Sequence, residues 1–436
     1  MKRILGDMVG RRSSMVIVFL LMLGLIWCGT SWAQAPPTTA SLIVKLRAGL
    51  SPDDQAAVFT TNGGTATPSV PALRLYVVQV PAAELSTFMQ NYQNDPRVER
   101  VEENKVRKIE ALPADPLYST QQWALAKIGW ESVFGTIVPT GTAKVAILDT
   151  GVDASHPDLA GKVLPGTSVL DGSNGQTDLN GHGTLLAGIV AANTDNSQGI
   201  AGVAYAGVHI LPVTVLSPSG LGQDSDIIAG VMWAADNGAD VILMGFSNPG
   251  FSNNLQDAID YAWSKNIVLV ASTGNDAQNA ATFPAGHRGV MGVSATDTTD
   301  ALAPFSNYGQ AVFIAAPGAG IVGPELSNSY VEITGTSPSA AIVAGVAAFM
   351  RAVDPTLSNA VIISRIARTT DPAGTVEQTG NGRINMPRAL GDTSTEGIQP
   401  AGAAPVGGGG RLWGRMWRRR GASISPLPGL AGAPAP

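Results

Sequence analysis

Three short stretches of the 436-residue chain carry side chains that could perform nucleophilic and acid–base chemistry. Asp149 follows the apolar run VAIL, His182 lies between glycines in NGHGT, and Ser337 ends GTS ahead of an apolar segment. A serine hydroxyl is a weak nucleophile unless a base takes its proton, and that base needs a carboxylate to orient its ring. The order Asp, His, Ser is one of three in which such triads occur. These residues therefore predict acyl-transfer chemistry.

The triplet Asp149-Thr150-Gly151 has a second interpretation, because a strand ending in Asp-Thr-Gly also presents the catalytic carboxylate of an aspartic protease. That chemistry needs two carboxylates sharing a proton, and hence a second Asp-Thr/Ser-Gly triplet. The chain contains no other such triplet. A symmetric dimer would supply one, but it would leave the His182 and Ser337 motifs unexplained.

The elements that position these residues follow from the hydrophobic pattern of residues 113–391. Short apolar runs alternate with segments of helical spacing, which predicts a parallel sheet covered by helices on both faces. Active sites of such sheets lie at the carboxyl ends of the strands. Residues 224–238 are a typical helical segment, with an acidic start and Gly238 as the stop. The apolar runs are KVAILDT, VHILPVTVL, VILMGF, IVLVAST and VMGVSAT.

At these motifs the chain resembles the subtilisin-like serine proteases, and most closely their thermitase-like branch. The resemblance extends over residues 113–391 and rests on DTGVDASHPDL, GHGT, TDNSQGIAGVA, ASTGN, TFPAG and GTS, in the order of the family. It implies an α/β, three-layer subtilisin-like fold with a mainly parallel sheet, and a serine endopeptidase. It also implies roles for four residues: Asp149 orients the imidazole, His182 is the general base, Ser337 is the nucleophile and Asn275 supplies the oxyanion-hole amide.

The resemblance also assigns substrate-binding positions. An extended substrate pairs by strand addition with an edge segment, and the side chain before the scissile bond enters a pocket. Small residues at the pocket predict that it accepts a large apolar side chain. The edge segment corresponds to Ser219, Gly220, Leu221 and Gly222, the substrate-binding strand begins at Gly245, and the pocket corresponds to Ser272, Thr273 and Gly274.

The chain departs from the family pattern near these positions. The family has Met-Ala after the nucleophile and Ser-Leu-Gly in the substrate strand, whereas this chain has Pro338-Ser339 and Gly245-Phe246-Ser247. The second histidine of the family after His-Gly-Thr is Leu185. Because proline has no N–H, Pro338 excludes the oxyanion arrangement of α/β-hydrolases but is compatible with the subtilisin-like one. The departures motivate an alternative function, a pseudoprotease that binds peptides without turnover.

A structural calcium ion is a further expectation. The polar loop TDNSQGI offers oxygen atoms of the kind that Ca²⁺ binds, and a solvated polar turn is the alternative. By resemblance to the thermitase-like branch, the side-chain ligands are Asp115, Asp158 and Asn196. The backbone carbonyls of Asn193, Gln198 and Ile200 complete the expected set.

Residues 34–112 predict a propeptide, with a small α+β unit at about residues 41–110. Strand-like runs at 41–47 and 73–80 flank segments of helical spacing, and a Ser-x-x-Asp cap begins at Ser51. The unit resembles the ferredoxin-like inhibitory propeptides of these proteases, which implies intramolecular inhibition and cleavage near residues 108–114. An independent accessory domain is the alternative.

Residues 1–33 predict a secretory signal peptide, because four basic residues precede the apolar run MVIVFLLMLGLIW and small residues at Ser31 and Ala33 favour cleavage after Ala33. The expected location is therefore extracellular or periplasmic, with an uncleaved membrane anchor as the alternative. The single cysteine, Cys28, would be lost with the signal, so the exported protein would have no disulfide.

Composition limits the partners. A formal net charge of −6, with 44% apolar and 14% charged residues, suits a large globular core and excludes a broadly basic nucleic-acid binder. Peptide substrates and the chain's own propeptide are the expected partners of a monomer.

Residues 392–436 are rich in Gly, Ala and Pro and predict a disordered tail. Trp413 and Trp417 lie there among five arginines, which indicates contact with an anionic surface; a solvated tail is the alternative.

Overall fold

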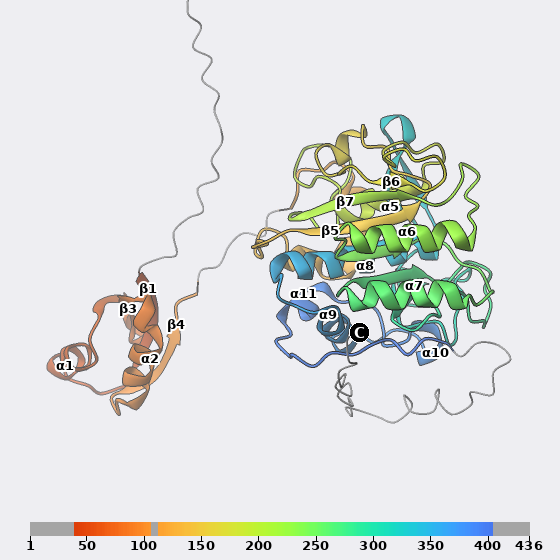
Figure 1. Cartoon of the computed structure of the whole chain (residues 1–436). Coiled ribbons are helices and arrows are strands. Elements are labelled where there is room, and N and C mark those ends of the chain that lie inside the picture. Colours follow the sequence, from red (N-terminus) through yellow and green to blue (C-terminus); the bar gives the residue numbers. More distant parts are fainter. Residues whose placement is uncertain (1–38, 106–111, 404–436) are drawn as a thin grey trace, which may run out of the picture. The chain divides into compact units, whose positions relative to one another are not determined.

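The computed structural model describes residues 39–105 and 112–403, which form two compact units that divide near residue 108 (Figure 1). The expected signal peptide and the cluster around Trp413 and Trp417 lie outside the described residues. So does part of the expected processing region near residues 108–114. Each unit has a sheet and a hydrophobic core of its own.

The N-terminal unit is a four-stranded antiparallel sheet with two helices. Its strand order, β2-β3-β1-β4, is that of a ferredoxin-like fold, and its core contains Leu42, Val44, Val78 and Tyr92. As the sequence predicts, Ser51 caps the first helix. The elements are β1 (Thr39–Leu46), α1 (Pro52–Asn62), β2 (Thr65–Val70), β3 (Leu75–Pro81), α2 (Leu85–Asn94) and β4 (Val98–Glu103).

Strand β2 is not indicated by the sequence, because TATPSV lacks an apolar alternation and contains a proline. It is an edge strand that pairs only with β3. A proline is tolerated at a sheet edge, where its missing N–H costs no ladder hydrogen bond.

The second unit is built on a seven-stranded sheet in which every pairing is parallel. The strand order is β11-β10-β9-β8-β5-β7-β6. The five apolar runs of the sequence form β5 and β7 to β10, so the predicted parallel sheet is confirmed. The strands are β5 (Ala143–Asp149), β6 (Thr167–Ser168), β7 (Val208–Thr214), β8 (Val241–Met244), β9 (Val268–Ser272), β10 (Val290–Thr296) and β11 (Ile314–Pro317).

Helices cover both faces of this sheet, as predicted. Val145 and Ile147 of β5 enter the core shared with α5 (His182–Ala191) and α8 (Thr336–Val353). Ala146 and Leu148, which point to the opposite face, enter the core shared with α6 (Asp224–Asp236) and α7 (Asn253–Ser264). Figure 1 shows α6 and α7 side by side on one face of the sheet. The result is a three-layer α/β unit.

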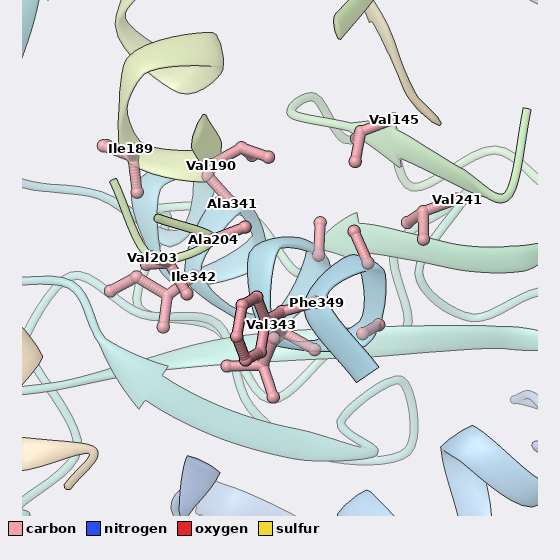
Figure 2. Packing of buried hydrophobic residues seen from close by; sticks show 14 of the residues in the cluster. Val145, Ile189, Val190, Val203, Ala204, Val241, Ala341, Ile342, Val343 and Phe349 are labelled. Atoms are coloured by element: carbon pink, nitrogen blue, oxygen red, sulfur yellow. The ribbon is translucent and has the colours of Figure 1, made fainter. Parts of the chain in front are cut away.

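Helix α8 lies at the centre of the larger core. Figure 2 shows Ala341 of this helix close to Val190 of α5, and Ile342 close to Val203. Among the described helices, α8 is the one long and apolar enough to cross a membrane, but 94% of its apolar stretch is buried within the unit. Its composition is therefore that of a core helix.

The remaining elements surround the sheet. An antiparallel hairpin, β12 and β13, leads into α8. Within the described part of the second unit, two short helices precede β5 and three helices follow α8. Their bounds are β12 (Ile321–Glu325), β13 (Ser329–Ile333), α3 (Tyr118–Gln121), α4 (Trp123–Lys127), α9 (Asn359–Arg368), α10 (Val376–Thr379) and α11 (Met386–Gly391).

Residues 392–403, which we call the C-terminal strap, differ from the prediction. Their composition predicts the start of a disordered tail, whereas in the structure they lie against the second unit. The N–H of Ile398 donates to the carbonyl of Ala360 in α9, and the N–H of Ala403 donates to the carbonyl of Gly286. These contacts are made by the backbone, so a composition without periodicity does not reveal them.

Candidate active site

The carboxyl end of β5 and the start of α5 bring together two of the predicted residues. Asp149 is fully buried, and each of its carboxylate oxygens lies 2.9 Å from Nδ1 of His182. His182 is the first residue of α5, and 31% of its side chain is exposed. A carboxylate therefore orients the imidazole, while the ring remains accessible from the surface.

Asp178 organises the turn before His182. Its buried carboxylate accepts hydrogen bonds from Thr150 Oγ1 at 2.9 Å, Gly181 N at 2.9 Å and Thr184 N at 3.0 Å. Burial lowers the pKa of His182, but the charge and hydrogen bond of Asp149, together with the charge of Asp178, outweigh it. The pKa of His182 is therefore raised above its ordinary value, which makes the imidazole a stronger base.

Ser337 is the second residue of α8 and is largely buried. Its hydroxyl donates a hydrogen bond to the carbonyl oxygen of Gly245 at 2.7 Å, and not to His182. A Cβ at Gly245 would lie 3.1 Å from Cε1 of His182 and 3.2 Å from Oδ2 of Asp149. Asp149, His182 and Ser337 therefore converge on the backbone of Gly245.

Two N–H donors are available near Ser337. Asn275 accepts hydrogen bonds through Oδ1 from the N–H and from the hydroxyl of Thr336, both at 2.9 Å. This pairing fixes the amide and leaves Nδ2 as a donor. The N–H of Ser337 lies in the first turn of α8, where backbone donors have no intrahelical partner and the helix dipole favours negative charge. The arrangement can hold an oxyanion.

The predicted edge segment, residues 219–222, forms an exposed turn. The N–H of Ser217 donates to the carbonyl of Leu221 at 2.8 Å, and Leu221 is 73% exposed. Asn180 Nδ2 donates to the carbonyl of Pro218 at 2.8 Å. This bond connects the turn to the residues directly before His182, so the segment lies beside the site.

The predicted pocket segment, residues 272–274, presents mainly its backbone. The side chains of Ser272 and Thr273 are buried, and Thr273 Oγ1 donates to the carbonyl of Val293 at 3.0 Å. Gly274 has a φ of +96° and lies close to the hydroxyl of Ser247. The side chains of Ser272 and Thr273 are thus turned into the core. Gly274 has no room for a side chain, because a Cβ there would lie 2.5 Å from Nδ2 of Asn307 and 2.6 Å from Oγ of Ser247.

The loop at residues 193–200 gathers the residues expected at a calcium site. Asp115 Oδ2 accepts from the N–H of Asp195 at 2.8 Å, and Asp158 Oδ1 accepts from Asn196 Nδ2 at 3.0 Å. Both aspartates are buried. The pKa of Asp115 is raised by burial and by the charges of Asp158 and Asp195, although backbone hydrogen bonds from Asp195 and Asn196 oppose the shift. In the described ranges, no three His, Cys, Asp or Glu side chains are grouped so that they could hold a metal ion by themselves.

The loop fits a hard cation. Two buried carboxylates repel each other, and a cation would offset that repulsion. All four of their oxygens already accept hydrogen bonds, from Asp195, Asn196, Ile200 and Tyr330. The expected backbone ligands would add neutral carbonyl oxygens. These oxygens are available to a cation, because they accept no hydrogen bond from the part of the chain that the structure describes. These carbonyls belong to Asn193, Gln198 and Ile200.

The fold and the sequence of the second unit match known proteases. A solved structure of the proteases from Pseudoalteromonas arctica PAMC 21717 aligns with a TM-score of 0.58 and 31% identity, covering 64% of this chain and 99% of that chain. The subtilase family, peptidase S8, matches residues 141–391. The chain belongs to the subtilase family. It is therefore a serine-type endopeptidase, as the motifs predict.

Two relatives support the thermitase-like branch of the subtilases. Thermitase from Thermoactinomyces vulgaris is 39% identical over 279 residues, which cover 64% of this chain and 99% of that protein. The thermophilic serine proteinase from Bacillus sp. (strain AK1) is 34% identical over 350 residues, covering 80% of this chain and 86% of that protein. The fervidolysin N-terminal prodomain matches residues 35–104, so this subtilase carries a prodomain.

Three supporting residues of the site are not indicated by the sequence analysis. They are Asp178, Thr336 and Asn307, whose Oδ1 accepts from the N–H of Asp276 at 3.0 Å and so fixes the loop that carries Asn275. Asp178 has a weak sequence signal, since an aspartate ahead of a glycine-containing turn often accepts backbone hydrogen bonds. Asn307 has no such signal, because its partners are about thirty residues away in the chain.

Proposed function

We propose that this subtilase is exported as a zymogen and cleaves peptide bonds with Ser337 as nucleophile, His182 as general base and Asp149 as the orienting carboxylate. The observation that carries the proposal is the 2.9 Å pairing of Asp149 with Nδ1 of His182, beside the Gly245 carbonyl that holds the Ser337 hydroxyl. The raised pKa of His182 supports its role as a base.

In the proposed reaction, the Ser337 hydroxyl turns from the Gly245 carbonyl to Nε2 of His182. Its oxygen bonds to the substrate carbonyl carbon while its proton passes to Nε2. Asn275 Nδ2 and the N–H of Ser337 hold the tetrahedral oxyanion, and each donor contributes about 3 kcal/mol. The His182 imidazolium then protonates the leaving amine as the C–N bond breaks. In the second half of the reaction, a water oxygen bonds to the acyl carbon while His182 takes the proton of the water. The imidazolium then returns a proton to the Ser337 oxygen as the ester bond breaks.

The proposed substrate is an extended peptide with a large apolar side chain before the scissile bond. The peptide pairs with the edge segment at 219–222 and with the segment at Gly245–Ser247, which directly follows β8. Support for the apolar preference comes from Gly274, which carries no side chain, and from the inward-facing side chains of Ser272 and Thr273. A substrate-library profile that favours charged side chains at this position would contradict the proposal.

The loop at 193–200 is proposed to bind a structural Ca²⁺. Side-chain oxygens of Asp115, Asp158 and Asn196 would hold the ion together with the three backbone carbonyls described above. Bound there, Ca²⁺ would neutralise two buried carboxylates and join the start of the second unit to the loop. It takes no part in the proposed proton transfers.

The prodomain is proposed to inhibit the enzyme until the chain cuts itself near residues 108–114. Export through cleavage after Ala33 and contact of the segment around Trp413 and Trp417 with an anionic surface are further parts of the proposal. The basic, apolar start of the chain supports the former, and the five arginines near the two tryptophans support the latter.

The test is to express the wild type, Ser337→Ala and, as a matched control, Ser339→Ala, and to measure the intact mass of each. Ser339 lies in the same turn of α8, but its hydroxyl donates to the carbonyl of Pro317. The wild type and Ser339→Ala are expected to lose the prodomain, and Ser337→Ala to keep it. A fluorophosphonate should label Ser337 in the matured chains. Retention of the prodomain without labelling in the wild type would instead support a pseudoprotease.

A further inference from the structure

The C-terminal strap is attached to the second unit at two places. Its first half lies along α9, where Arg365 Nε donates to the carbonyl of Ser394 at 2.9 Å and Arg368 pairs with Asp392 at 3.2 Å. Its second half lies against the loop at residues 282–289. The N–H of Gly289 donates to the carbonyl of Pro400 at 2.9 Å, and the N–H of Ala403 donates to Gly286 at 2.7 Å.

The contact between the strap and this loop is close. Gly402 has a φ of +74°, and a Cβ there would lie 2.6 Å from the N of Arg288 and 2.7 Å from the O of Gly286. Pro400 and Ala403 are buried, although they lie near the end of the described residues. The strap therefore packs against the loop backbone with no room for a side chain at position 402.

The other side of the loop is bonded to the substrate-binding segments. The N–H of Phe283 donates to the carbonyl of Asn248 at 2.7 Å, and the N–H of Asn248 donates back at 2.8 Å. Thr282 Oγ1 donates to the carbonyl of Thr273 at 2.6 Å. The loop therefore joins the segment that follows Gly245 to the segment that ends at Gly274.

We infer that the C-terminal strap is a positioning segment for substrate binding: by holding the loop at 282–289, it fixes the separation of the two segments that form the pocket. The inference rests on the proposed function. The strap lies beyond residue 391, where the match to the subtilase family ends, so no family pattern assigns it a role.

Two substitutions in the full-length chain test the inference. Gly402→Ala places a Cβ against the loop backbone, and Ala403→Asp puts a charge into the buried contact. Gly391→Ala is the control for the first, because a Cβ there meets nothing within 4 Å. Ala401→Asp is the control for the second, because Ala401 is exposed.

The measurements are KM and kcat on two peptides that differ only in Phe or Ala before the scissile bond, and the rate at which a small fluorophosphonate labels Ser337. We expect both test variants to raise KM for the Phe peptide about tenfold and to reduce the preference for Phe over Ala. Labelling should stay within about twofold of the wild type, since the reagent needs the triad but not the pocket. Both controls should match the wild type.

Unchanged KM and unchanged Phe preference in both test variants would overturn the inference. Labelling that falls in parallel with peptide cleavage would also overturn it, because the strap would then support the whole unit and not the pocket. Absence of labelling in the wild type is a different result, which would overturn the proposed function itself.

Discussion

A Cβ on Gly183 would lie 2.0 Å from the carbonyl oxygen of Gly151, so the start of α5 touches the backbone that follows β5. Gly183 directly follows His182, and Gly151 lies two residues after Asp149. The distance between Asp149 and His182 therefore depends on a contact that only glycine allows at position 183.

This contact predicts a large effect of Gly183→Ala on activity. Because the obstacle is a backbone oxygen, α5 must move away from β5, and the 2.9 Å pairing of Asp149 with His182 is lost. We expect kcat/KM to fall at least about 100-fold. In the control variant Gly391→Ala, at the end of α11, the added Cβ meets nothing within 4 Å. Its kcat/KM should fall less than about tenfold, and equal effects of the two variants would contradict the argument.

Removing the charge of Asp178 should shift the pH profile of kcat/KM. The charge of Asp178 raises the pKa of His182, and His182 must be neutral to act as a base. In Asp178→Asn the imidazole therefore stays neutral to lower pH, so the acidic limb of kcat/KM should move to lower pH. The lost hydrogen bonds should also reduce the free energy of unfolding by about 1–3 kcal/mol.

The control for this experiment is Asp171→Asn, an exposed aspartate in the loop between β6 and α5. Asp171 is not among the charges that act on His182, so its removal should leave the acidic limb in place. If the acidic limb of Asp178→Asn stays in place or moves to higher pH, the charge of Asp178 does not set the pKa of His182. Asp178 would then act only by holding the turn through its hydrogen bonds.

Most of the fold could be predicted from the sequence because its signals are local. The central strands are long apolar runs, and α6 begins with acidic residues and ends before Gly238. Strands β6 and β11 could not be predicted, since β6 has two residues and β11 is the short run IAAP. The strap could not be predicted because it is held by Arg365 and Arg368 of α9 and by backbone hydrogen bonds to α9 and to a distant loop.

The residue types of the candidate site could be predicted from motifs, but the hydrogen bonds that hold them could not. Nothing near Thr336 in the sequence indicates that its N–H and hydroxyl both donate to Asn275, 61 positions earlier. The bond between the Ser337 hydroxyl and the Gly245 carbonyl spans 92 positions. Such pairs depend on how the strands are ordered in the sheet, which the sequence pattern leaves open.

Thr336 predicts a role in positioning the oxyanion-hole amide. Thr336→Val keeps the shape of the side chain and the N–H donor but removes the hydroxyl that donates to Asn275 Oδ1. We expect kcat to fall roughly tenfold with KM nearly unchanged, against about 100-fold or more for Asn275→Ala. Thr336→Ser, which retains the hydroxyl, should restore most of kcat. A Val variant with the kcat of the wild type would show that the backbone N–H alone fixes the amide.

The loop at 193–200 predicts that calcium stabilises the protein. If the ion binds the folded state at about one hundred times its Kd, chelation should remove about 2.7 kcal/mol and lower Tm by about 5–10 °C. Asp158→Asn should lower Tm in calcium and abolish the effect of chelation, because it removes one of two buried carboxylates. Asp257→Asn, an exposed aspartate on α7, is the control and should respond to chelation like the wild type. A Tm of the wild type that chelation leaves unchanged would mean that the hydrogen bonds of the loop suffice to hold Asp115 and Asp158 together.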